Sequence, residues 1–222
     1  MIVIGLTGGI GSGKSTVSEH LVARSAVLID ADALVKKLQS PGGEVYGDMV
    51  AHFGEVIVAD DGTLNRQAIA DIVFSDKEQL KALNEMVHPV VNRVIREQIR
   101  AQANTDNLVV LDIPLLIESL LLPGPPRYVT SGVLVVDTPP ETAIARLVEH
   151  RGFAQDDAEK RIKNQVSREK RLELADFVVD NGGALDALAP QLEAAWEWAT
   201  ALPPTEPTPE PEELPVIESQ DD

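Results

Sequence analysis

Residues 2–16 constrain the fold of this chain more than any other stretch of its sequence. Residues 2–6 form an apolar run with the composition of a buried β-strand. Residues 8–15 follow with the pattern G-x-x-x-x-G-K-[ST], the Walker A motif. After the motif, apolar side chains recur at helical spacing. A strand, a glycine-rich loop and a helix in this order predict an α/β domain that binds phosphate at the loop.

The chemistry of the loop explains its residue types. Glycine lets the backbone approach an anion closely because no Cβ stands in the way. Successive N–H groups can then point into one concavity, and the dipole of the following helix favours an anion there. We expect Lys14 to reach the β- and γ-phosphates of ATP, and the Ser15 hydroxyl to ligate Mg²⁺.

A glycine-rich turn that only reverses the chain would also fit these residues. The strand before the loop and the helix after it favour nucleotide binding instead. The expected ATP-binding residues of the loop are Gly8, Gly9, Ile10, Gly11, Ser12, Gly13, Lys14, Ser15 and Thr16.

The composition excludes several classes of protein. The 222 residues, 44% of them apolar, suffice for one or two domains with a sizeable core. The absence of cysteine excludes disulfides, thiolate zinc sites and a cysteine nucleophile. The net charge of −17 argues against broad binding to nucleic acid or to anionic membranes. Because there is no signal-peptide pattern and no apolar run of about 18 residues, we expect a cytoplasmic protein with no evident protein partner.

Short apolar runs alternate with helical patterns along much of the chain. This alternation is typical of βαβ units and implies a parallel sheet covered by helices on both faces. The fold class is therefore α/β. Beyond the first strand, we expect strands at residues 26–30, 108–112, 133–137 and 177–179.

Two further segments differ from this alternation. Residues 44–104 have mainly helical patterns, with Ser75 and Glu78 as a capping box and Pro89 in the first turn of a later helix. Such an insertion between strands is a natural place for an acceptor site. Residues 203–222 contain six prolines and seven acidic residues but no lysine or arginine, which predicts a disordered tail.

Carboxylates end two of the expected strands. Asp30 and Asp32 follow the second strand and Asp112 closes the third, at the sheet edge where α/β proteins bind ligands. Asp32 could orient an acceptor hydroxyl and accept its proton. Asp112 occupies the Walker B position, where an aspartate holds Mg²⁺ directly or through water. The purely structural alternatives are a helix N-cap at Asp30, a first-turn charge at Asp32 and a strand-end cap at Asp112.

A basic stretch, residues 151–171, follows Arg146. Such charge runs are usually exposed helix faces. Near a phosphate loop, however, this stretch could form a cationic lid, because arginines stabilise charge on a transferring group and closure excludes water. Arg146 is the strongest single candidate for that role.

In combination, the motifs of the chain resemble those of the bacterial dephospho-coenzyme A kinases. The likeness covers residues 5–183. Two positions depart from the family pattern: Lys36 replaces an arginine and so loses its bidentate fork, and Ile117 replaces a phenylalanine. The matching motifs are Gly5 to Ser15, Asp30-Ala-Asp32, Leu64-Asn-Arg66, His88-Pro89, Asp112-Ile-Pro-Leu-Leu-Ile-Glu118, Arg146-Leu-Val-Glu-His-Arg151, Arg161-Ile-Lys-Asn-Gln165 and Ala175-Asp176 through Asn181.

This resemblance implies a P-loop kinase with three layers, α/β/α, and a five-stranded parallel sheet. The kinase domain would span residues 1–200, with its core at 1–40 and 105–200, a helical CoA-binding insertion at about 44–104 and a lid at about 151–172. The implied reaction uses ATP and Mg²⁺ to phosphorylate the ribose 3′-hydroxyl of dephospho-CoA, giving CoA and ADP in the last step of CoA biosynthesis. Asp32 would be the base, Lys14 the phosphate ligand and Arg146 the lid arginine. The resemblance also places Arg66, His88, Glu118 and Gln165 near the acceptor or the lid.

Other functions fit parts of the sequence. Another small-molecule P-loop kinase, acting on a nucleoside monophosphate or a sugar-like alcohol, would keep the roles of Lys14 and Arg146. A P-loop ATPase switch would bind partners instead, but the cationic stretch favours a kinase, and a guanine-specific Asn-Lys-x-Asp motif is absent. A scaffold that uses the acidic tail would leave the phosphate loop unexplained.

Overall fold

The computed structural model describes residues 1–124 and 126–206. The chain divides into two compact units. One contains Met1–Ile29 together with the chain from Ile99 onward, and the other is Asp30–Gln98. The first unit holds the sheet, whereas the second is helical and contains most of the expected insertion at 44–104.

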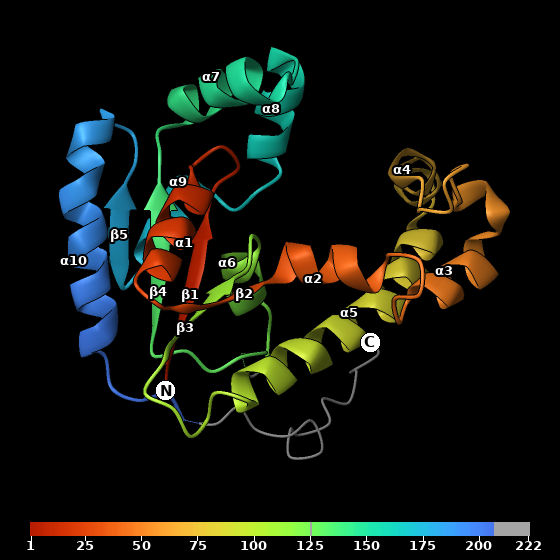
Figure 1. Ribbon diagram of the computed structural model, residues 1–222. Coiled ribbons are helices and arrows are strands. Elements are labelled where there is room, and N and C mark those ends of the chain that lie inside the picture. Colours follow the sequence, from red (N-terminus) through yellow and green to blue (C-terminus); the bar gives the residue numbers. More distant parts are fainter. Residues whose placement is uncertain (125, 207–222) are drawn as a thin grey trace. The chain divides into compact units, whose positions relative to one another are not determined.

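A five-stranded sheet forms the centre of the first unit. Its strands are β1 (Ile2–Gly8), β2 (Val27–Asp30), β3 (Leu108–Asp112), β4 (Gly132–Asp137) and β5 (Phe177–Asp180). They lie in the order β2-β3-β1-β4-β5 (Figure 1). The central strand β1 runs parallel to β3 and to β4, and β4 runs parallel to β5. The predicted α/β fold with a five-stranded parallel sheet is confirmed.

Helices cover both faces of this sheet. The helices of this unit are α1 (Lys14–Ala23), α6 (Leu116–Leu120), α7 (Pro140–Arg151), α8 (Gln155–Lys163), α9 (Arg168–Glu173) and α10 (Leu188–Ala201), with a short 3₁₀ turn η2 (Leu185–Ala187) before α10. Of these, α7 and α8 lie beyond the carboxyl end of β4 rather than on a face of the sheet (Figure 1). Helices α1 and α10 pack into one apolar cluster with β1, β3, β4 and β5. Helix α6 packs against the opposite side of β4.

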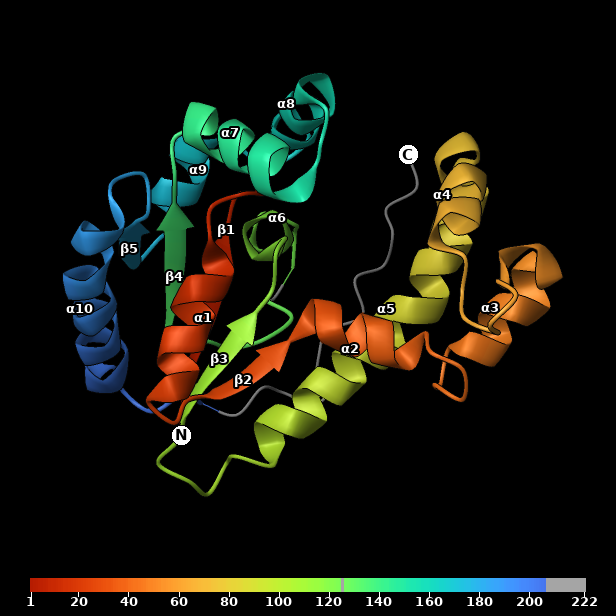
Figure 2. The same cartoon turned by 45° about the horizontal axis from the view of Figure 1, so that its top comes forward.

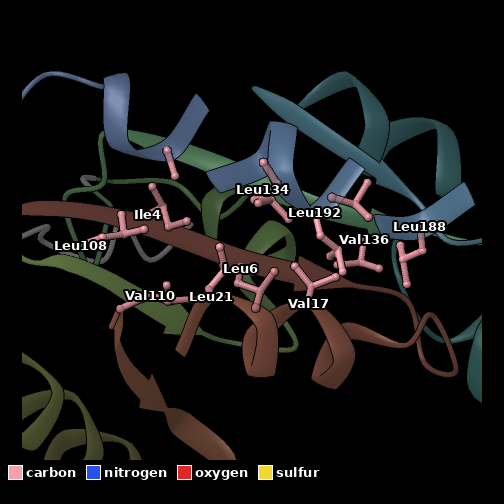
Figure 3. Packing of buried hydrophobic residues seen from close by; sticks show 14 residues of the cluster. Ile4, Leu6, Val17, Leu21, Leu108, Val110, Leu134, Val136, Leu188 and Leu192 are labelled. Atoms are coloured by element: carbon pink, nitrogen blue, oxygen red, sulfur yellow. The ribbon is translucent and has the colours of Figure 1, made fainter. Parts of the chain in front are cut away.

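The strand β4 shows why its residues are apolar throughout. Leu134 and Val136 join the cluster of α1 and α10, whereas Val133 and Val135 join the cluster of α6. Successive strand residues point to opposite faces, so a strand buried on both faces needs a continuous apolar run. The α1 and α10 side of this core includes Ile4, Leu6, Val17, Leu21, Leu108, Val110, Leu134, Val136, Leu188 and Leu192 (Figure 3).

The second unit is helical. Its elements are α2 (Ala31–Leu38), α3 (Tyr46–Phe53), the 3₁₀ turn η1 (Glu55–Ile57), α4 (Arg66–Ser75) and most of α5 (Lys77–Arg100), shown from orange to yellow-green in Figure 2. Polar contacts join these elements. Tyr46 donates a hydrogen bond to the Gly62 carbonyl at 2.6 Å, and Arg93 on α5 pairs with Glu44.

Two local expectations within this unit are wrong. Ser75 ends α4 and donates to backbone carbonyls of its own helix, and Asp76 instead accepts the Glu78 N–H at 2.8 Å at the start of α5. Pro89 lies inside α5 rather than in the first turn of a new helix. The apolar face continues through this proline, with Val87 and Val91 both buried, and so keeps α5 as one helix.

The segment after α10 returns to the beginning of β1. Thr205 Oγ1 accepts the Val3 N–H at 2.6 Å, and the Thr205 N–H donates to the Met1 carbonyl at 3.1 Å. Of the expected tail at 203–222, residues 207–222 lie outside the described residues. Among the described helices, none is long and apolar enough to cross a membrane.

Candidate active site

The loop between β1 and α1 has the backbone geometry of a phosphate site. Gly13 precedes α1 with φ 82° and ψ 27°. This left-handed conformation is strained for residues with a Cβ, so the last glycine of the motif is required by the turn. A further turn closes where the Ser12 N–H donates to the Gly9 carbonyl at 3.0 Å. Ser15 and Thr16 are exposed in the first turn of α1, where the helix dipole favours an anion. We call residues 8–16 the phosphate loop.

The phosphate-loop lysine meets the carboxylate at the end of β3. Lys14 Nζ forms an ion pair with Asp112 Oδ1. The register of the sheet explains the contact, because Leu6 of β1 lies opposite Asp112 of β3. The Asp112 side chain is only 8% exposed, so it is held beside the lysine rather than in solvent. The structure therefore brings together two residues that the sequence predicted for one site.

Arg146 lies at the Gly13 end of the phosphate loop. It donates to the Asn181 carbonyl at 2.8 Å and to Thr138 Oγ1 at 3.4 Å. Asn181 Nδ2 in turn donates to the Ser12 carbonyl at 2.8 Å. Sequence reasoning gave Asn181 no separate role, although its position directly after β5 is a usable signal. Thr138 also contacts the loop, where its hydroxyl donates to the Ser12 carbonyl at 3.2 Å.

Gln165 contacts the other end of the phosphate loop. Its Oε1 accepts the Ile10 N–H at 2.9 Å. Beside it, Glu118 of α6 accepts the Val166 N–H at 3.1 Å. Two residues that the sequence placed near the acceptor or lid thus hold the segment between α8 and α9 against the loop and against α6.

Arg171 is a residue at the loop that sequence reasoning did not single out. A Cβ on Gly9 would lie 2.9 Å from Arg171 Nη2, so the guanidinium rests directly on the loop backbone. Its Nη1 donates to the Val166 carbonyl. Burial lowers the pKa of the Arg171 guanidinium below its usual range. The sequence marked Arg171 only as one of several basic residues in the stretch 151–171.

Arg168 is tied to the end of β4. Its guanidinium makes a two-point contact with Asp137, at 2.9 Å from Nε to Oδ1 and 2.6 Å from Nη2 to Oδ2. Hydrogen bonding to Asp137 raises the pKa of Arg168. Asp137 is buried and closes an apolar strand, as Asp112 does.

The second unit holds the other predicted residues. Asp32 is exposed in the first turn of α2, where the preceding Asp30 caps the helix by accepting the Ala33 N–H at 2.9 Å. Arg66 begins α4 after the N-cap Asn65, and His88 is exposed on α5. In the structure as described, no cluster of three or more His, Cys, Asp or Glu side chains could hold a metal by itself.

The fold and the site define the class of protein. A Walker A loop, a carboxylate from the neighbouring strand beside its lysine, and arginines from the following helices are the parts of a P-loop kinase. Residues 2–187 match the family described as dephospho-CoA kinase. The chain belongs to this family.

Individual relatives agree over nearly their whole length. A dephospho-CoA kinase of Thermobifida fusca is 40% identical over 197 residues, which cover 89% of this chain and 96% of the relative. One of Streptomyces avermitilis is 43% identical, covering 88% and 93%. Among solved structures, TT1252 from Thermus thermophilus is 34% identical with a TM-score of 0.72, covering 89% of this chain and 97% of that one.

Proposed function

We propose that this protein transfers the γ-phosphate of ATP to the ribose 3′-hydroxyl of dephospho-CoA, giving CoA and ADP. The observation that carries the proposal is the contact between Lys14 and Asp112 at a Walker A loop, in a chain of the dephospho-CoA kinase family. The acceptor is a small molecule, and the reaction, the last step of CoA biosynthesis, belongs in the cytoplasm. No protein, membrane or nucleic-acid partner is needed for it.

The phosphate loop, residues 8–16, binds the ATP phosphates in this proposal. Its backbone N–H groups and the N-terminus of α1 attract the anion. Lys14 binds the β- and γ-phosphates after exchanging its contact with Asp112 for phosphate oxygens. The loop is therefore neutralised by Asp112 without nucleotide and by phosphate with it.

The donor set beside the loop suits Mg²⁺. The exposed Ser15 hydroxyl and the Asp112 carboxylate are hard oxygen ligands, and Mg²⁺ is usually held by one or two such groups together with substrate phosphates and water. The lack of a larger ligand cluster among the described residues agrees with this mode of binding. When bound, the ion would neutralise charge on the β- and γ-phosphate oxygens.

Asp32 serves as the base in the proposed mechanism. It would accept the proton of the 3′-hydroxyl as that oxygen bonds to phosphorus. Because Asp30 already caps α2, the carboxylate of Asp32 is not needed for that purpose. We assign Arg66 and His88 to binding of the acceptor in the same helical unit, and Glu118 and Gln165 to the ordering of the lid.

The lid, residues 151–172, excludes water from the transferring group. Arg146 enters the site from the helix before the lid and contributes positive charge beside the Gly13 end of the loop. An arginine near the phosphates lowers the barrier because charge builds up on the transferring group and leaving group.

One assay tests the function. ADP release is measured with dephospho-CoA, AMP, CMP, shikimate and gluconate offered in turn. We expect stimulation by dephospho-CoA alone, and a product whose new phosphate is removed by a 3′-specific phosphatase. The variant Lys14→Met serves as the inactive control. Stimulation by a nucleoside monophosphate, shikimate or gluconate instead would replace the proposal with the other kinase activity.

A further inference from the structure

Arg171 is a cation without a carboxylate partner at the phosphate loop. Its guanidinium rests on Gly9 and, within the described residues, donates a hydrogen bond to the Val166 carbonyl. Within residues 1–124 and 126–206, no Asp or Glu oxygen lies within 4.0 Å of the guanidinium nitrogens, so Arg171 forms no ion pair there. The side chain is half-buried, and burial lowers its pKa. The carboxylates of Glu118, Asp137 and Glu169 raise its pKa through their charge but do not pair with it directly. A direct anionic partner at this point would therefore offset the cost of burying the guanidinium.

The other basic side chains near the loop bind carboxylates or lie at its other end. Arg168 makes its two-point contact with Asp137, and Lys170 pairs with Glu173 on the surface. Arg146 donates to the Asn181 carbonyl at the opposite end of the loop. Arg171 alone among these four combines burial, contact with the phosphate loop and the absence of a carboxylate partner among the described residues.

The contacts around Arg171 hold it in one orientation. The Val166 carbonyl binds Nη1, while the Val166 N–H is bound by Glu118 from α6. Gln165 next to Val166 binds the Ile10 N–H of the loop. The ideal Cβ position on Gly9 is 3.4 Å from Arg171 Cζ and 3.7 Å from Gln165 Oε1, so both side chains occupy the space that this glycine leaves open.

We propose that Arg171 is a catalytic residue that binds the γ-phosphoryl group of ATP at the Gly9 end of the loop, and that Gln165 is the positioning residue that fixes the loop against it. The inference rests on the proposed kinase function. During transfer, the acceptor oxygen bonds to the γ-phosphorus as the bond to the bridging oxygen of ADP breaks. The acceptor proton passes to the base, and Arg171 keeps its own protons throughout. The fork of Arg171 would donate to equatorial oxygens of the γ-phosphoryl group, on which charge is spread in transfer.

The test compares Arg171→Ala and Arg171→Lys with Lys170→Ala. The last variant is the matched control, because it removes a neighbouring cation whose ion pair with Glu173 lies on the surface. We expect Arg171→Ala to lower kcat about 10³-fold, in line with the loss of an arginine at a transferring phosphoryl group. Its affinity for ADP should stay within about twofold, whereas its affinity for a non-hydrolysable ATP analogue should fall about tenfold. Arg171→Lys should retain part of the activity, because lysine keeps the charge but loses the fork.

Two measurements separate a catalytic role from a structural one. Methylguanidinium added to Arg171→Ala should restore turnover at least tenfold, which a residue needed only for packing would not allow. Gly9→Ala should push the guanidinium away and lower kcat while Arg171 remains in the chain. If Arg171→Ala does not fold, Gly9→Ala and Arg171→Lys carry the same test.

The proposal is overturned if kcat of Arg171→Ala stays within threefold of the wild type, or if ADP and the ATP analogue lose affinity equally. The two binding measurements need no acceptor. A wild type that fails to phosphorylate dephospho-CoA would therefore reject the proposed function, whereas the ratio of ADP to analogue affinity would still decide the role of Arg171.

Discussion

Lys14 Nζ contacts Asp112 Oδ1 within the first unit, joining the start of α1 to the end of β3. Each side chain balances the other's charge where both are largely buried: the Lys14 side chain is 20% exposed and the Asp112 side chain 8% exposed. A lysine that is paired in this way is already extended toward the position of the phosphates. The cost of ordering its long side chain is therefore met before ATP binds.

Replacing Asp112 by Asn should separate the two roles proposed for this carboxylate. Asparagine keeps the shape but loses the charge that attracts both Lys14 and Mg²⁺. We expect kcat to fall about 10²-fold or more, since electrostatic groups at a phosphoryl-transfer site contribute this much, and the Mg²⁺ concentration for half-maximal rate to rise. Initial rates measured over a range of Mg²⁺ concentrations test this. An unchanged Mg²⁺ dependence would show that Asp112 acts only as a structural partner of Lys14.

Asp32→Asn tests the proposed base. We expect turnover to fall by about 10²- to 10⁴-fold, the usual contribution of general base catalysis, while ATP binding measured by calorimetry is retained. Asp30→Asn is the matched control, because asparagine is an equally good N-cap and α2 should persist with activity near the wild type. Near-normal turnover of Asp32→Asn would reduce Asp32 to a favourable charge in the first turn of α2.

Arg146→Ala should slow turnover and weaken ATP binding together. The guanidinium is fixed on the Asn181 carbonyl beside Gly13, so its charge acts on bound nucleotide before and during transfer. A loss of about 10²-fold in kcat/KM for ATP is expected. Glu149→Gln, at an exposed position of the same helix, should behave as the wild type. If Arg146→Ala and Glu149→Gln turned over ATP at equal rates, Arg146 would have no role in the reaction.

Much of the fold could be predicted because its signals are local. The apolar runs give the strands, and the Walker A spacing gives the turn from β1 into α1 with Gly13 at positive φ. The nearness of Lys14 and Asp112 could be expected in outline, because the loop after β1 and the end of β3 lie at the same edge of the parallel sheet. For these residues, the order of strands and loops in the sequence is enough to predict which edge of the sheet they reach.

The contacts of the basic stretch, residues 151–171, could not be predicted in the same way. Whether Arg168 or Arg171 faces the phosphate loop depends on which of them is captured by the buried carboxylate of Asp137. That choice depends on side-chain geometry between α9 and β4, and a charge count along the chain contains no such information. Pro89 was misplaced for a related reason, because packing of the buried face of α5 overrides the local preference of proline for a first turn.

The pair of Arg168 and Asp137 should contribute to stability as well as to lid order. Removing Arg168 leaves a carboxylate that is 7% exposed without its partner, but the arginine is itself 39% exposed, so screening by solvent reduces the effect. We expect Arg168→Ala to lower the free energy of unfolding by about 1–2 kcal/mol. A double-mutant cycle with Asp137→Ala, followed by urea unfolding, should give a coupling of about 1 kcal/mol. Lys170→Ala, which removes an exposed pair, should change stability by less than about 0.5 kcal/mol. Additive effects of the two changes would mean that the pair contributes nothing.

Two truncations should separate the structural part of the C-terminus from the rest. Ending the chain after residue 206 keeps Thr205, whose hydroxyl accepts the N–H of the fully buried Val3. Ending it after residue 202 leaves that N–H without its protein partner, which costs about 1–3 kcal/mol for a buried donor. We therefore expect the shorter chain to unfold at lower urea concentration, with Thr205→Val in the full chain reproducing most of the loss.

Both truncated proteins should keep full activity at 25 °C, because this contact is at the beginning of β1 and the phosphate loop follows its end. Equal unfolding midpoints for the two truncations would show that the Thr205 contact does not stabilise the sheet, and loss of activity in the longer truncated protein would give residues 207–222 a role in the reaction.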